Sequence, residues 1–244
     1  MFCSEYPRAV VQVVGPDAFT YLQSQLSQDL RPLQVGASMW SFVLQPTGKI
    51  DVLLRVWRTS DETFVLDTDA GFGDTLIARL NRFKIRVKAD ISPLDWRCLA
   101  VRGDGAAGVD GLASWGAGVD IVGTAPQVPE GAAVGGAAEL LAARVAAGWP
   151  QMGIEIEPGD SIPAETGVIA VAVSFTKGCY PGQELVERMD SRGATAPRVL
   201  QVVDVPAGTQ PGDDYLLDGV VVGTVTSVSG ALALAFVKRS ALQH

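Results

Sequence analysis

The residue best suited to covalent chemistry is Cys179, which lies in the segment Lys177-Gly178-Cys179-Tyr180-Pro181-Gly182-Gln183-Glu184. Apolar residues recur at helical spacing after this segment, and Pro181 suits the first position of a helix. A helix is therefore predicted to begin just after Cys179. Free backbone N–H groups there, together with the Lys177 ammonium, favour a thiolate, the nucleophilic form of cysteine. A lone cysteine is as often a small buried apolar residue, so the segment alone leaves both roles open.

The histidine count excludes several mechanisms. The only histidine is His244, the last residue, whereas Ser-His-Asp triads, Cys-His dyads and H-E-x-x-H zinc sites all need a well-placed imidazole. Cys3 and Cys98 are far from Cys179 in the sequence, and no two of the three form a C-x-x-C pair. We therefore expect no metal site and no disulfide. Cys98 should be buried in an apolar strand, and Cys3 should lie in a mobile terminus and react as an ordinary thiol.

Composition indicates a folded, acidic chain. Of 244 residues, 48% are hydrophobic and 19% are charged, and the net charge of −8 does not favour direct binding to nucleic acid. No apolar stretch is long enough to span a membrane, so no membrane partner is expected. Glu5 and Pro7 occupy the place where a signal peptide would have its apolar core. A cytoplasmic location is therefore expected.

Hydrophobic patterning predicts an α+β fold in which hairpins and helices are mixed. Helices are predicted after Gly15-Pro16-Asp17, over Phe72–Phe83 and over Glu139–Ala147, where Gly148 would act as the C-cap. Residues 103–148 are rich in alanine and glycine and have little other local pattern. The predicted strands are Ala9–Val14, Ser38–Leu44, Ile50–Trp57, Thr63–Asp67, Leu94–Val101, Val199–Val205, Tyr215–Leu217, Val220–Val228 and Ala231–Val237.

The change to short, glycine-punctuated strands near residue 195 predicts a domain boundary. Residues 1–195 should form one region of two lobes with a break near residue 92, and residues 196–244 a small C-terminal β-barrel. The segment Gly103-Asp104-Gly105-Ala106-Ala107-Gly108 fits the dinucleotide pattern G-x-G-x-x-G. Gly111 and Gly116 interrupt the helix that such a site requires, so an ordinary loop is favoured.

A basic stretch stands out in this acidic chain. Arg79 is followed by Arg82, Lys84, Arg86 and Lys88, and from Arg82 to Lys88 the cations alternate with apolar residues. This alternation predicts a strand with its cations on one face. Such a face could simply be solvated, or it could bind an anion such as a polyglutamate tail, RNA or an acidic partner.

The segment 177–184 resembles the signature K-G-C-[YF]-x-G-Q-E of the YgfZ family. These folate-binding proteins are related to the aminomethyltransferase, or T-protein, of the glycine cleavage system. Further segments resemble the family's L-Q-G-Q-x-T-x-D-V helix, its P-x-G-K hairpin, its R-x-x-x-G-x-P segment and its closing strands; they are residues 21–30, 41–58, 144–167 and 223–239. The resemblance implies two intertwined T-protein-like lobes around a folate-sized hole, with a small C-terminal β-barrel.

The resemblance also implies a function and a set of site residues. Family members support the maturation or repair of iron–sulphur enzymes, including enzymes that modify tRNA, and depend on the motif cysteine. Cys179 with Lys177 would be the reactive pair, tetrahydrofolate or another reduced folate the ligand, and iron–sulphur enzymes or their assembly factors the partners. Arg144 matches the arginine that faces the folate in T-proteins, and Asp51 is a second candidate folate contact.

Two other functions stay open at this point. T-proteins carry a pair of acids after the hairpin glycine, but here Gly48-Lys49-Ile50-Asp51-Val52 keeps only one, which disfavours aminomethyl transfer. A thiol redox or persulfide carrier that needs no folate is the third possibility. The cysteine motif, which aminomethyltransferases lack, favours a non-catalytic accessory factor over aminomethyl transfer. Binding of tetrahydrofolate would distinguish the accessory factor from the thiol carrier.

Overall fold

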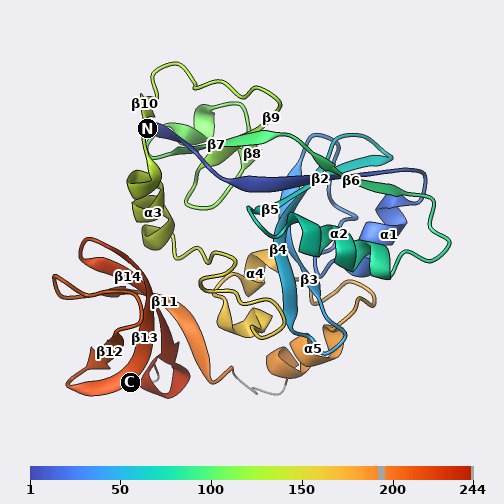
Figure 1. Ribbon diagram of the computed structural model, residues 1–244. Helices are drawn as coiled ribbons and strands as arrows, with labels where there is room; N and C mark the ends of the chain where they lie inside the picture. The colour runs from blue at the N-terminus through green and yellow to red at the C-terminus, as the bar shows by residue number, and fades with distance from the viewer. Residues whose placement is uncertain (192–195, 243–244) are drawn as a thin grey trace.

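The computed structural model describes residues 1–191 and 196–242 and consists of three β-sheets with helices between and around them (Figure 1). His244 lies outside the described residues. The first sheet has the order β3-β4-β5-β2-β6, with every neighbouring pair antiparallel. Its strands are β2 (Arg8–Val14), β3 (Ser38–Leu44), β4 (Ile50–Arg58), β5 (Thr63–Asp69) and β6 (Asp90–Leu94).

Helices α1 (Ala18–Gln25) and α2 (Gly73–Arg82) cover one face of this sheet. Val52, Leu54 and Val56 of β4 pack on that side, whereas Leu53 belongs to a second core on the opposite side. Side chains of a strand point to alternate faces, so burial of both faces explains why β4 reads as an almost continuous apolar run.

The second sheet joins the N-terminus to the middle of the chain, in the order β10-β1-β7-β9-β8. Strand β1 (Phe2–Glu5) pairs antiparallel with β7 and parallel with β10. Because the next strand, β2, lies in the first sheet, the chain crosses from one sheet to the other within its first residues. Cys3 is 1% exposed, so the expectation of a mobile terminus was wrong. The strands are β1 (Phe2–Glu5), β7 (Arg97–Arg102), β8 (Leu112–Ala113), β9 (Val119–Gly123) and β10 (Ala133–Val134).

The third sheet is C-terminal and has the order β11-β14-β13-β12. Its strands are β11 (Arg198–Asp204), β12 (Asp214–Leu217), β13 (Val220–Ser229) and β14 (Leu232–Lys238). Helix α3 (Ala137–Ala146) packs Val145 against Leu200, Leu234 and Phe236 of this sheet. Among the described residues β11 and β12 do not pair with each other, so the predicted barrel is an open antiparallel sheet.

Short helices complete the fold and connect the sheets. They are α4 (Ile169–Ala172), α5 (Gln183–Ser191) and the 3-10 turns η1 (Ala106–Gly108), η2 (Pro163–Glu165) and η3 (Arg239–Leu242). The glycine pattern at 103–108 forms the turn η1 between strands and presents no α-helix N-terminus to a dinucleotide, in agreement with the loop expected there. No described helix combines the length and the hydropathy needed to cross a membrane.

The predicted strand over Arg82–Lys88 is wrong. Helix α2 continues to Arg82, and residues 83–89 form a loop in which Arg86 takes a left-handed backbone conformation with φ of 58°. A strand needs extended backbone throughout, and the left-handed conformation of Arg86 interrupts it; residues 83–89 pair with no strand of the described sheets.

Candidate functional site

The cysteine motif forms an irregular loop that is fastened at its first residue. The Lys177 ammonium, 5% exposed, donates hydrogen bonds to the carbonyl oxygens of Gln23, Leu26 and Gln28 at 2.6, 2.6 and 3.0 Å. These carbonyls lie at and beyond the C-terminal end of α1, where helical carbonyls lack intrahelical donors. Burial lowers the pKa of Lys177 to about 8, yet three acceptors are all satisfied only by the protonated amine.

Two further motif residues fix the loop to the body of the protein. Tyr180 is 7% exposed in the central core, and its burial raises the pKa of the phenol to about 12. Gly182 has φ of 85°, and a Cβ there would lie 2.5 Å from the carbonyl oxygen of Gln45 and 2.9 Å from Cα of Gly48. Only glycine therefore lets the β3–β4 hairpin approach the start of α5 this closely.

Cys179 is exposed, as is its neighbour Gly178, so no packing role holds the thiol in place. Helix α5 begins at Gln183, four residues after Cys179, and not directly after the cysteine as predicted. The Lys177 ammonium is also turned toward the carbonyls at the end of α1. The arrangement predicted from the sequence, with Cys179 directly before a helix N-terminus and beside the Lys177 ammonium, is therefore not formed. Instead, Cys179 is an accessible thiol on a loop that other motif residues hold in place.

The last two motif residues lie in the first turn of α5. The Gln183 amide donates to Glu187, and Glu184 pairs with Arg188 at 2.7 Å in the predicted i, i+4 arrangement. These contacts are exposed, and exposed pairs of this kind stabilise a helix by only a few tenths of a kcal/mol. Lys177, Tyr180 and Gly182 are therefore the residues that hold the loop.

A cavity of about 570 Å³ lies where the N-terminal crossing segment, the end of β5 and α3 meet. Its wall includes Tyr6, Asp69, Trp115, Leu140 and Arg144. These residues come from four separate stretches of the chain, so no local motif marks the cavity. Its volume is within the range of about 300–1,000 Å³ that is common for small-molecule sites.

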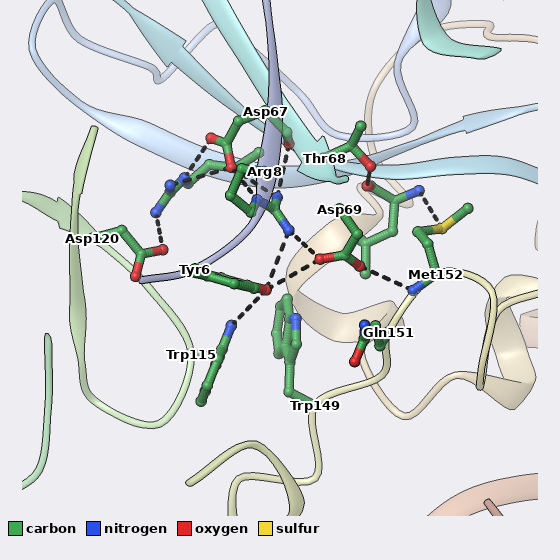
Figure 2. Close-up of polar contacts among 12 residues, drawn as sticks. Tyr6, Arg8, Asp67, Thr68, Asp69, Trp115, Asp120, Trp149, Gln151 and Met152 are labelled. Carbon is green, nitrogen blue, oxygen red and sulfur yellow. Dashed lines mark hydrogen bonds and ion pairs between the residues drawn. The ribbon is translucent and has the colours of Figure 1, made fainter. Parts of the chain in front are cut away.

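The inner wall of the cavity is polar, and Figure 2 shows how its residues converge. The Asp69 carboxylate accepts hydrogen bonds from Arg8 at 2.6 Å, from the Tyr6 hydroxyl at 3.3 Å and from the Met152 backbone N–H at 2.9 Å. The Trp115 indole N–H donates to the Tyr6 hydroxyl at 3.4 Å. Burial raises the pKa of Tyr6 above its ordinary value, so this phenol stays protonated. Sequence reasoning did not identify Tyr6, Arg8 or Asp69 as site residues.

Behind this wall, three arginines and three aspartates form a buried ionic network of zero net charge. Arg55, fully buried on β4, contacts Asp67 at 2.9 Å and Asp120 at 2.9 Å. Arg8 joins Asp67 to Asp69, and Arg102 contacts Asp120 at 2.9 Å. Because Asp67 lies on β5 and Asp120 on β9, the network ties the first sheet to the second.

The structure separates the two residues predicted to bind folate. Arg144 lies on the cavity wall, but its guanidinium contacts Glu155 at 2.8 Å and the Ser227 hydroxyl at 2.6 Å. It thereby connects α3 to β13 of the C-terminal sheet. Asp51 is absent from the residues that line this cavity and pairs with Arg79 at 3.1 Å.

The remaining thiols and carboxylates do not assemble a metal site. Within residues 1–191 and 196–242, no group of three or more cysteine, histidine, aspartate or glutamate side chains is arranged to hold an ion. Cys98 is 2% exposed, as predicted, and its burial raises the pKa of the thiol; burial raises the pKa of Cys3 as well.

Comparison with solved structures defines the class of fold. The crystal structure of the glycine cleavage system aminomethyltransferase T from Bartonella henselae matches 98% of this chain and 78% of its own, with a TM-score of 0.78. The sequence identity is 20%, so the match concerns the fold alone. The chain has an α+β fold similar to that of this aminomethyltransferase.

Sequence relatives then narrow the resemblance. The chain is 26% identical to the tRNA-modifying protein YgfZ of Cronobacter sakazakii, over 84% of this chain and 72% of that protein. It is 27% identical to a mitochondrial iron-sulfur cluster assembly factor IBA57 homolog of Pyricularia oryzae, over 88% of this chain and 60% of the relative's length. No family model matches. These relatives and the structural neighbour confirm the resemblance to the YgfZ family and its relation to T-protein.

Proposed function

We propose that this protein is a folate-binding accessory factor that supports the maturation or repair of iron–sulphur enzymes, with Cys179 as its working thiol. The observation that carries the proposal is that the residues holding the motif loop in place are different from the residue it exposes. Lys177, Tyr180 and Gly182 fasten the backbone, while Cys179 is left exposed. The proposal is further supported by relatives that are named for iron–sulphur cluster assembly and for tRNA modification.

The chemistry available to a single exposed thiol determines the kind of partner it needs. Iron–sulphur clusters usually take four cysteine ligands, so Cys179 alone cannot hold one. The partner, an iron–sulphur enzyme or an assembly factor, would supply the other ligands, and Cys179 would act transiently at its surface. We place this role in the cytoplasm, as expected from the sequence. Replacement of Cys179 by serine in cells is the test of this part of the proposal.

The folate part of the proposal concerns the cavity beside Asp69. A reduced folate carries a ring with several N–H donors, and a carboxylate in a half-enclosed site is a suitable acceptor for them. Trp115 and Leu140 provide the apolar surface that a flat ring would contact. Arg144 would shape the wall from behind, since its guanidinium is engaged with Glu155 and Ser227. The N-terminal crossing segment, the end of β5 and α3 would thus enclose the ligand.

Tetrahydrofolate should quench the intrinsic tryptophan fluorescence of the protein in a saturable titration, because Trp115 lies on the cavity wall. Ala137→Trp places an indole on that wall and should weaken binding by tenfold or more, a loss of about 1.4 kcal/mol or more. Ala138→Trp, on the same helix but outside the lining, is the matched control and should bind normally. Unchanged fluorescence together with no heat of binding in calorimetry would remove folate from the proposal.

The two alternative functions make different predictions in the same assays. An aminomethyltransferase like T-protein would share this fold. However, Asp51 is engaged with Arg79, and it is the only acid after the hairpin glycine, where T-proteins carry a pair. Aminomethyl transfer to tetrahydrofolate by the purified protein would favour this alternative. A thiol redox or persulfide carrier that needs no folate would show no folate binding while still requiring Cys179.

A further inference from the structure

The last residue of α2 and the loop that follows it, together called the basic loop (residues 82–88), carry four cations that have no acidic partner. Arg82, Arg86 and Lys88 are exposed and Lys84 is half-buried. Within the described part of the chain none of the four forms an ion pair. The Lys84 ammonium donates only to the carbonyl of Ala89, and the Arg82 guanidinium lies 5.8 Å from the Phe83 ring. In a chain of net charge −8, this loop concentrates uncompensated positive charge.

An exposed aliphatic side chain lies in the middle of these cations. Ile85 is 78% exposed, and the left-handed conformation of Arg86 turns the chain directly after it. Phe83 is half-buried, and the Arg79 guanidinium lies 4.0 Å from the centre of its ring. The loop therefore presents an aliphatic centre with a charged rim, and not an exposed aromatic surface.

We propose that this basic loop, residues 82–88, is a docking site for the acidic face of a protein partner. The proposal rests on the accessory function proposed above, because it names the kind of surface that the served partner should carry. A polar rim around an apolar contact is the usual composition of a protein–protein interface. A site for single-stranded RNA usually has exposed aromatic rings on which the bases stack. In addition, the negative net charge of the chain would repel a polyanion that extends beyond the basic loop.

The position of the loop relative to Cys179 fits a single partner. The Lys88 backbone N–H donates to the Asp17 carboxylate at 2.7 Å, just before α1. The Lys177 ammonium contacts the other end of α1 through the carbonyls of Gln23 and Leu26. Helix α1 has 8 residues, so at about 1.5 Å per residue its length is roughly 12 Å. An interface of about 800 Å² per partner is wide enough to cover both ends.

Binding of two labelled probes separates a protein partner from a nucleic acid. The probes are a fluorescein-labelled glutamate-rich peptide with interspersed leucines and a labelled single-stranded RNA of equal charge, measured by anisotropy at low and physiological salt. The charge variant is Arg82→Glu combined with Arg86→Glu. The control, Arg97→Glu with Lys238→Glu, makes the same charge change at two other exposed positions. Ile85→Ser tests the apolar centre without a change of charge.

We expect the unmodified protein to bind the peptide more tightly than the RNA. The charge variant should bind the peptide about tenfold more weakly than the unmodified protein, and the control variant should bind it with unchanged affinity. Ile85→Ser should weaken the peptide about fivefold, since an apolar contact is lost. Tighter binding of the RNA, lost in the charge variant, would overturn the proposal in favour of a nucleic acid. Equal peptide binding by all variants would also overturn it. Neither readout involves Cys179. Full function of Cys179→Ser in cells would therefore refute the proposed accessory function without affecting the proposal that the basic loop is a docking site.

Discussion

Lys177→Met should lower the free energy of unfolding by about 3–5 kcal/mol. Methionine keeps most of the length of the side chain but removes all three hydrogen bonds to Gln23, Leu26 and Gln28. The buried Leu26 carbonyl left without a donor costs roughly 1–3 kcal/mol, and the part-buried carbonyls of Gln23 and Gln28 add less each. The relief of not burying an ammonium offsets part of the sum. Equilibrium unfolding in urea, followed by far-UV circular dichroism, measures the change.

Lys49→Met is the matched control for this substitution. Lys49 is partly exposed and pairs with Asp160 at 3.2 Å, so its replacement should cost less than about 1 kcal/mol. A cost for Lys177→Met that does not exceed that of the control would show that the three carbonyl contacts do not hold the motif loop. The expected result also predicts faster proteolysis of the loop, because the loop loses its anchor to α1.

Arg55→Met should lower the free energy of unfolding by about 3–5 kcal/mol at neutral pH. Arg55 is fully buried between Asp67 and Asp120, and its removal leaves buried carboxylates with too little positive charge around them. Arg97→Met, which breaks an exposed pair with Glu5, is the control and should cost less than about 1 kcal/mol. A loss in Arg55→Met no larger than that in Arg97→Met would mean that the network does not join the two sheets.

The cost of Arg55→Met should also depend on pH. Burial pushes the pKa of Asp67 upward, but Arg55 and Arg8 outweigh burial and hold it below its usual value. This carboxylate therefore stabilises the fold above the unfolded pKa of about 3.9, and the stabilisation is lost as the pH falls through the folded pKa. Once Arg55 is gone, protonation of Asp67 removes an uncompensated charge. The cost should be smaller near pH 4 than at about pH 7.

The longer elements were predictable because their packing leaves a local pattern. Strands β3, β4 and β13 begin at the predicted residues, since their runs of apolar residues are bounded by turn residues. Strands β8 and β10 have two residues each and lie in an alanine- and glycine-rich stretch, so no pattern marks them. The Arg82–Lys88 alternation resembled a strand, but Arg86 takes a left-handed conformation that ends any extended run, and alternation of residue types does not reveal this.

The site was predictable only where its residues are contiguous. The motif 177–184 identified the thiol, but Lys177 is 149 to 154 residues from the carbonyls that it contacts, and nothing in the local sequence marks such a pair. Tyr6, Asp69 and Trp115 likewise meet only through the crossing of the N-terminus between the sheets. Asp51, chosen for its place after a hairpin, pairs with Arg79, a residue whose burial the sequence did not reveal.

The proposed role of Cys179 predicts a loss of function without a loss of fold. Cys179→Ser changes one exposed atom, so the urea midpoint and the tetrahydrofolate titration should match those of the unmodified protein. Thr176→Ala, exposed in the same loop, controls for any local disturbance. Both variants would be expressed at equal levels in cells that lack this protein.

The most direct measurement is the activity of an iron–sulphur enzyme in those cells, normalised to the amount of enzyme protein. If Cys179 is the working thiol, Cys179→Ser should restore no more activity than an empty vector, whereas Thr176→Ala should restore all of it. Full restoration by Cys179→Ser would contradict the account, because the motif loop would then be a structural element whose exposed cysteine has no part in the function.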